Sequence, residues 1–270
     1  MLISKMHSSG NDFCIVDFIE KTDFKSLAVK ICNRKLGVGA DGLIVVKKSP
    51  RLEMLYYNMD GSTSSMNSNA LRCFVRYSKE NGYFKGDKVE VLTGAGLILV
   101  EIENENPFEC KINLGKPNFN NQMLHATDMI NNFGRVIDIE GIKVTIYSLF
   151  IGSIQTVILV NSFDDEIIKY AELIHSYKLF AKKTSVNFAI IKNKNEIDVK
   201  TYEKGVGFTY ASGDGCAASV IALNKLNLIR NTVRCNLELG YLNVDITKRG
   251  YVYLTGPAEK LFTCDFKEEN

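Results

Sequence analysis

The sequence predicts an α+β protein built from two similar domains, and three observations support this class. Strand patterns outnumber helical patterns along the 270 residues. One order of elements (strand, helix, two strands, small-residue turn, helix, further strands) occurs twice. A polar segment rich in asparagine, at 104–122, separates the two occurrences. A repeat of this length is not a solenoid unit, so we infer two α+β domains related by duplication.

In the first half, β-rich runs bounded by turn residues predict four strands, at 42–48, 52–58, 88–93 and 97–103. Apolar residues at helical spacing predict one helix over 24–35 and a second over 69–83. Gly82 is placed to end the second helix, because glycine adopts the backbone conformation that closes a helix.

The second half repeats this order. An amphipathic pattern predicts a helix over 166–180, and a Gly-rich turn precedes a helix over 214–227. Strands are predicted at 155–160, 186–192, 197–203, 233–239, 241–247 and 251–255.

The composition is that of a soluble globular protein, with 46% hydrophobic and 24% charged residues. The formal net charge is +2 and the basic residues are scattered, so no nucleic-acid partner is predicted. No apolar run reaches the roughly 18–20 residues of a membrane helix. The first residues lack a signal-peptide core, so we expect a cytoplasmic protein with no membrane partner.

Cysteine and histidine usage argues against a metal site. The seven cysteines form no CxxC pair, and we expect reduced thiols that are mostly buried. None of the three histidines stands at ligand spacing to another histidine or to a cysteine pair. No phosphate-binding Gly-Lys-Ser/Thr loop or Rossmann glycine pattern is present, so no cofactor is predicted.

Two turns, at 57–73 and 201–219, each lead small residues into the start of a predicted helix. A helix start exposes unpaired backbone N–H groups and the positive end of the helix dipole, which suits a carboxylate. Two such turns facing one cleft between domains would bind a small anion from both sides. The alternative is that both are ordinary tight turns with good N-caps.

Ordered motifs along nearly the whole chain resemble the diaminopimelate epimerase family. The opening motif is KMHSSGNDFCIVD (5–17), followed by GVGADGLIVV (37–46). YNMDGSTSSMNSNALRC (57–73) matches the first active-site motif and EKGVGFTYASGDG (203–215) the second. Shorter matches are TGAG (93–96), TSVNF (184–188) and VYLTGPAEKLF (252–262).

The resemblance implies two pseudo-symmetric domains, each a barrel-like, mostly antiparallel sheet around a central helix. With the closing strand returning to the first domain, the domains are expected at 1–116 with 256–270, and at 117–255. The family inverts the α-carbon of an amino acid without a cofactor, converting LL- to meso-diaminopimelate for lysine and peptidoglycan precursors. Members are often dimers, so a homodimer is expected.

In that family two cysteines at the helix starts remove and donate the α-proton. A helix start lowers a thiol pKa from about 8.5, so thiol and thiolate both exist near neutrality. Here the first cysteine position is Asn67 and the second is Ser212, and Asp214 replaces a threonine or serine. We take these three as the candidate catalytic residues. Ser153-Ile154-Gln155 stands where the family has Asn-Pro-His.

Other positions that the family uses to hold substrate are kept or conservatively changed. The expected substrate-binding residues for an amino-acid ligand are Asn11, Asn58, Ser68, Asn69, Ser153, Asn187, Glu203, Lys204 and Gly213. Lys204 stands for an arginine of the family, and Ser68 for a glycine.

Three functions remain open at this point. The first is an α-carbon epimerase with the altered pair Asn67 and Ser212. The second is an isomerase or eliminase with one base, Asp214 or Glu203, a scheme that the phenazine-biosynthesis isomerase of the same fold resembles. The third is a relative that binds an amino acid without catalysis. Asp214 is also a good N-terminal helix residue in its own right, and Cys73 and Cys216 are alternative thiols or core residues.

Overall fold

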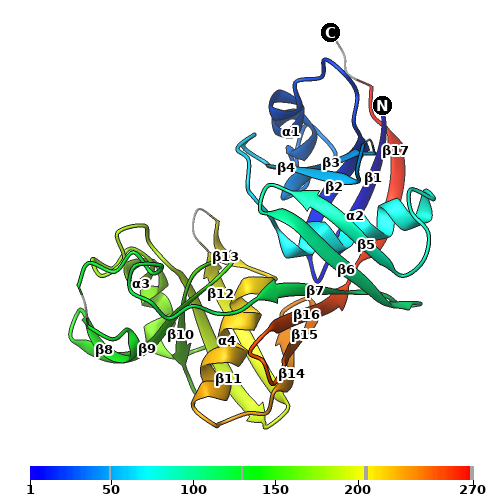
Figure 1. Ribbon diagram of the computed structural model, residues 1–270. Coiled ribbons are helices and arrows are strands. Elements are labelled where there is room, and N and C mark those ends of the chain that lie inside the picture. Colours follow the sequence, from blue (N-terminus) through cyan, green and yellow to red (C-terminus); the bar gives the residue numbers. More distant parts are fainter. Residues whose placement is uncertain (49, 129, 204–205, 268–270) are drawn as a thin grey trace. The chain divides into compact units, whose positions relative to one another are not determined.

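The computed structural model describes residues 1–48, 50–128, 130–203 and 206–267. The chain divides into two compact units, Met1–Ile112 with Thr255–Asn270, and Asn113–Leu254, called unit 1 and unit 2 below. The predicted division lies after residue 116. The chain leaves unit 1 within strand β7 (Phe108–Gly115) and returns to it within β16 (Val252–Pro257). Figure 1 shows the elements of both units.

The two units share one order of strand pairing. In unit 1 the successive strands are β1 (Leu2–Ser8), β2 (Asn11–Asp17), β3 (Gly42–Lys47), β4 (Glu53–Asn58), β5 (Lys88–Thr93) and β6 (Gly96–Glu105). Neighbours along this series pair in the order antiparallel, parallel, antiparallel, parallel, antiparallel.

Unit 2 repeats the same series with β9 (Ile142–Ile151), β10 (Ser153–Leu159), β11 (Ser185–Asn193), β12 (Glu196–Glu203), β14 (Thr232–Leu237) and β15 (Gly240–Ile246). Its pairings follow the same order of directions. The predicted α+β class and its two pseudo-symmetric halves are therefore confirmed.

The remaining strands extend these sheets. They are β8 (Phe133–Ile139), which pairs with β9, β13 (Gly207–Thr209), which pairs with β12, and β17 (Glu259–Asp265), which pairs with β1. Strand β7 lies inside the polar segment 104–122, where we predicted no strand. Its residues Phe108, Cys110 and Ile112 alternate along the strand and are buried, so one face of this strand contributes to the core although the segment looks polar.

Each unit has one central helix between the fourth and fifth strands of its series. These are α2 (Ser68–Glu80) in unit 1 and α4 (Gly213–Lys225) in unit 2. Ten of the thirteen residues of each helix are buried, so sheet strands cover most of its circumference. The expected arrangement of a sheet around a central helix is confirmed, and residues of α4 belong to the core cluster of unit 2.

The predicted starts of these helices are within one residue of the observed ones, and the helix ends differ more. The helix predicted over 24–35 is α1 (Phe24–Cys32). It stops early because Asn33 takes an extended conformation, and its side chain accepts hydrogen bonds from the N–H groups of Lys35 and Leu36. Helix α2 ends two residues before Gly82, which has a positive φ of 69° as expected of a closing glycine.

The helix predicted over 166–180 is wrong in extent. The segment forms a 3₁₀ turn, η1 (Glu166–Tyr170), and a five-residue helix, α3 (Ala171–His175). The His175 ring nitrogen bonds the carbonyl of Thr184 at 2.6 Å, and Leu179 and Phe180 turn into the core. Burial of these side chains outweighs the local amphipathic pattern, which is common for short helices.

Six of the seven cysteines are buried, as predicted, and Cys264 is half-exposed. None of the helices in the described residues is both long and apolar enough to cross a membrane.

Candidate active site

The start of α2 is closed by the side chain of its own N-cap residue, Asn67. Its Oδ1 accepts hydrogen bonds from the N–H groups of Asn69 at 2.9 Å and Ala70 at 3.0 Å. Asparagine is among the best N-cap residues because its short amide reaches these two donors. The expectation that both helix starts offer open amides to a carboxylate is therefore not met at α2, where Asn67 occupies two of them.

Three asparagines meet at this helix start. Asn11, at the beginning of β2, presents its Oδ1 to the Nδ2 groups of Asn69 at 3.1 Å and Asn67 at 3.5 Å. Asn69 in turn accepts a short hydrogen bond from the buried guanidinium of Arg72. Each amide thus has a defined orientation, since its oxygen and nitrogen have different partners. None of these amides can gain or lose a proton near neutrality.

An ion cluster behind Asn11 fixes its orientation. Asn11 donates to Asp41 at 2.7 Å, and Arg34 bridges Asp41 and Asp12 at 2.7 and 2.8 Å. Lys5 contacts Asp12 at 2.6 Å. Burial alone would raise the pKa of Asp12, but the hydrogen bonds from Arg34 and Lys5 outweigh it and hold that pKa at about 2. The Asp12 carboxyl is therefore ionised throughout the neutral range.

Asn58 and Ser68 lie nearby in the chain but have other contacts. Asn58, the last residue of β4, donates to the hydroxyl of Ser62 at 2.9 Å and so stabilises the turn that follows. Ser68 is the first residue of α2 and is buried. The structure thus brings Asn11, Asn67 and Asn69 into one hydrogen-bonded group and assigns Asn58 to the neighbouring turn.

The start of α4 has the same backbone geometry as that of α2. Ser212 is its N-cap, with φ −128° and ψ 113°, against −133° and 119° for Asn67. The Ser212 hydroxyl accepts from the N–H of Gly215 at 3.2 Å, and Gly213 is the first, buried residue of the helix. The two candidate positions are therefore structural equivalents, as the family motifs imply.

Asn187 on β11 anchors a second chain of polar groups beneath α4. It accepts from the hydroxyl of Thr201 at 2.9 Å and donates to Gln155 at 2.8 Å, which donates to Ser153 at 2.8 Å. A Cβ atom on Gly215 would lie 2.6 Å from the Thr201 hydroxyl and closer still to Asn187 Oδ1. Only glycine therefore lets the first turn of α4 rest on this chain.

The pKa of Asp214, the second residue of α4, is displaced towards neutrality. The residue is half-buried, and its carboxyl lies against Gly152, in the turn between β9 and β10. Burial, with a smaller contribution from the negative charge of Glu203, raises the pKa of Asp214 to about 7. Glu203 is the last residue of β12. The predicted residues Asp214 and Glu203 thus interact electrostatically.

Two further predictions concern lysine and cysteine. Lys204 lies outside the described residues. The alternative thiols Cys73 and Cys216 are fully buried, Cys216 within the core cluster of unit 2, and burial raises the pKa of Cys73. Both are core residues, so a shifted thiol pair is not supported.

Several contributors were not predicted from the sequence. Arg34 and Asp41 occur in a glycine-rich loop where no periodic pattern identifies them. Thr201 could have been found, because it lies on the same face of β12 as Val199 and Glu203. It is a polar residue at a buried position of that face. Gly152 has a positive φ of 66°, which a lone glycine between two strand patterns suggests.

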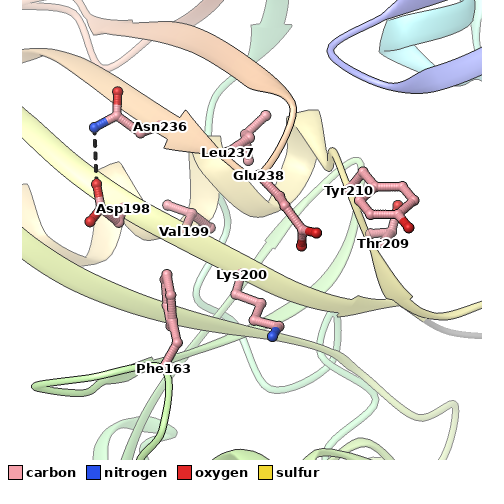
Figure 2. A pocket seen from close by; sticks show the side chains of 9 residues that line it. All are labelled: Phe163, Asp198, Val199, Lys200, Thr209, Tyr210, Asn236, Leu237 and Glu238. Atoms are coloured by element: carbon pink, nitrogen blue, oxygen red, sulfur yellow. Dashed lines mark hydrogen bonds between the residues drawn. The ribbon is translucent and has the colours of Figure 1, made fainter.

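A separate cavity of about 330 Å³ lies in unit 2 on the outer side of β12. Figure 2 shows the hydrogen bond from Asn236 to Asp198 on one side of it and Tyr210 on the other. Lys200 and Glu238 also line it. None of the predicted site residues lines this cavity, although Tyr210 precedes Ser212 by two residues.

The geometry permits acid–base chemistry by a carboxyl group, that of Asp214. No group of three histidine, cysteine or acidic side chains in the described segments is arranged to hold a metal ion. With its pKa raised to about 7, the Asp214 carboxyl can take or give a proton near neutrality, where general acid–base catalysis is most effective. Asn67 and Ser212 act as helix caps.

Comparison with known proteins identifies the same family along both units. The family model described as diaminopimelate epimerase matches residues 3–120 and 147–261. A diaminopimelate epimerase of Clostridium perfringens is 36% identical, and the alignment covers 98% of each chain. One from Caldanaerobacter subterraneus subsp. tengcongensis is 34% identical over 97% of this chain and 98% of its own.

Solved structures agree on the fold. The phenazine biosynthesis protein of the PhzF family from Bacillus anthracis superposes with a TM-score of 0.72, covering 99% of both chains. Its sequence is only 13% identical, so this likeness concerns the fold alone.

Proposed function

Because this chain belongs to the diaminopimelate epimerase family of isomerases, we propose that it moves a proton at the α-carbon of an amino acid, with Asp214 as the proton carrier. Diaminopimelate is the first candidate substrate, since curated relatives that are 34% and 36% identical to this chain bear its name. The observation that carries the proposal is the half-buried Asp214 carboxyl at the start of α4, whose pKa is raised to about 7.

In this proposal, Asn67 and Ser212 do not carry the α-proton. The Asn67 amide has no proton to exchange near neutrality, and its oxygen is engaged by two backbone N–H groups. The Ser212 hydroxyl is a far weaker acid than a thiol and needs a neighbouring base. In the proposal both residues stabilise their helix starts as N-caps, and Ser212 also donates a hydrogen bond to a ligand.

The proposed step transfers one proton and no other atom. The ionised carboxylate of Asp214 takes the α-proton as the Cα–H bond breaks, and the electron pair stays on the substrate as a carbanion conjugated with its carboxyl group. The now neutral carboxyl returns the proton to the α-carbon, or to another carbon of a conjugated substrate. Positive helix-end charge near Asp214 favours the extra negative charge on the substrate.

One carrier and two carriers predict different products. An epimerase needs a donor on the face opposite the base, whereas a single carboxyl returns the proton to the face it left. On an amino acid we therefore expect α-proton exchange with the configuration kept, which is a partial reaction without net isomerisation. A second candidate function follows from the same observation: migration of a double bond conjugated with the substrate carboxyl, which also requires only one carrier.

The test is exchange in deuterated water. The protein is incubated with LL- and meso-diaminopimelate and with a panel of L-amino acids, and deuterium at the α-carbon is measured by mass spectrometry. Asp214→Asn should abolish labelling, and Asp245→Asn, on β15 of the same unit, serves as the matched control that keeps it. Ligand binding without label in the wild type would contradict the proposal and support a non-catalytic relative.

A further inference from the structure

The turn between β9 and β10 is tight, and the Asp214 carboxyl lies against it. Ile151 and Ser153 are paired residues of the two antiparallel strands, and Gly152 alone separates them. Its φ of 66° lies in the left-handed region. This conformation favours glycine but does not require it, because asparagine also adopts it.

The space above Gly152 is a second and separate constraint. A Cβ atom on Gly152 would lie 2.9 Å from Cγ and 3.2 Å from Oδ1 of Asp214, and closer still to Oδ2. Real Cβ atoms do not approach other atoms this closely, so any side chain would displace the carboxyl. Many other glycines with positive φ lack this constraint: Gly141, in the turn between β8 and β9, has nothing within 4 Å of its Cβ position.

We infer that Gly152 is a positioning residue for Asp214: the absence of a side chain lets the carboxyl group lie against the turn, which covers one side of it. This inference rests on the proposed role of Asp214 as proton carrier. The contact removes water from that side of the carboxyl, and a desolvated carboxyl holds its proton more strongly.

The polar and charged groups around the carboxyl come from the strands beside α4 and from the helix start itself. Glu203 on β12 is the charged group that acts on Asp214. The nearby polar residues of β10, β11 and β12 are Ser153, Gln155 and Asn187 with Thr201, and none of them titrates near neutrality. The turn at Gly152 covers one side of the carboxyl, and Glu203 adds a repulsive charge.

The experiment compares Gly152→Ala with Gly141→Ala. Both place alanine at a positive φ in a hairpin turn of unit 2, so both carry similar backbone strain, but only the first meets Asp214. The titration of Asp214 is followed through its ¹³C-labelled carboxyl signal, assigned with Asp214→Asn, and deuterium exchange into diaminopimelate is measured in parallel. Gly152→Asn, which tolerates the left-handed conformation, is the second variant in case Gly152→Ala does not fold.

Gly152→Ala should lower the pKa of Asp214 by about one unit or more, as expected when a buried carboxyl regains water, and Gly141→Ala should leave it in place. An unchanged Asp214 titration in both Gly152 variants, with exchange as fast as in the wild type, would overturn the positioning role and leave the proposed function intact. A shifted titration in proteins that never exchange would support the positioning role and refute the proposed function.

Discussion

Replacing Asp214 by asparagine should stabilise the protein at alkaline pH, and the structure sets the size of the effect. The pKa of this carboxyl rises from 3.8 to about 7 on folding. A carboxyl with a raised folded pKa favours folding below its unfolded pKa, and this contribution is lost as pH increases through the folded pKa. Ionisation of Asp214 therefore lowers the stability of the wild type above about pH 4. The asparagine variant has no carboxyl at this position and keeps its stability.

Linkage gives the magnitude. A shift of one unit corresponds to about 1.4 kcal/mol, so a shift of roughly three units corresponds to about 4 kcal/mol at full ionisation. Between pH 5 and pH 8 the stability of Asp214→Asn relative to the wild type should increase by about 2 to 3 kcal/mol, part of the full amount being lost already below pH 5. The free energy of unfolding is measured with urea and circular dichroism at both pH values.

Asp245→Asn controls for the loss of a half-exposed carboxyl in the same unit. A difference between Asp214→Asn and the wild type that is equal at pH 5 and pH 8 would refute the reasoning. It would mean that the carboxyl is solvated in the folded protein and that its contact with Gly152 does not persist in solution.

Other predictions follow from the same contacts. Asn67→Ala should lower the free energy of unfolding by about 1 kcal/mol through loss of the N-cap, while Asn67→Asp keeps the cap and should lose less; equal stabilities would contradict the capping role. Asp12→Asn should destabilise by about 2 kcal/mol at pH 7, and the deficit should shrink as pH falls from about 4 towards 2, because the depressed pKa of Asp12 contributes stability only above that range. In native alkylation followed by mass spectrometry, Cys264 should react first, and early labelling of Cys73 or Cys216 would show that the central helices open. Asn67→Cys combined with Ser212→Cys places thiols at two N-caps of matching backbone geometry and should create inversion at the α-carbon, measured by chiral chromatography.

Much of the fold could be predicted from local pattern, because the central helices begin with strong signals. Asn67 and Ser212 are favourable N-cap residues that follow turns of small residues, and both helices begin within one residue of the predicted position. The segment 166–180 could not be predicted, because its conformation depends on the bond from His175 to Thr184 and on core contacts of Phe180. Such tertiary contacts have no local signature.

The motifs lead to a set of candidate site residues, but they do not give the interactions of these residues. The motifs identify Asn11, Asn69 and Asn187, but the direction of each amide depends on partners such as Asp41 and Gln155 that lie far away in sequence. The raised pKa of Asp214 has the same origin. It requires the β9–β10 turn at the start of α4, a contact across more than sixty residues of chain that only the folded unit creates.

Deuterium labelling with stereochemical analysis tests the central claim most directly. LL-diaminopimelate is incubated with the protein in deuterated water near pH 7, and the α-carbon label and the proportion of the meso form are followed together. If Asp214 is the proton carrier, label should depend on Asp214 and accumulate much faster than the meso form, because one carboxyl exchanges the proton on one face. The proton-carrier role of Asp214 would be contradicted if the meso form appeared as fast as label entered, and if it still formed in Asp214→Asn.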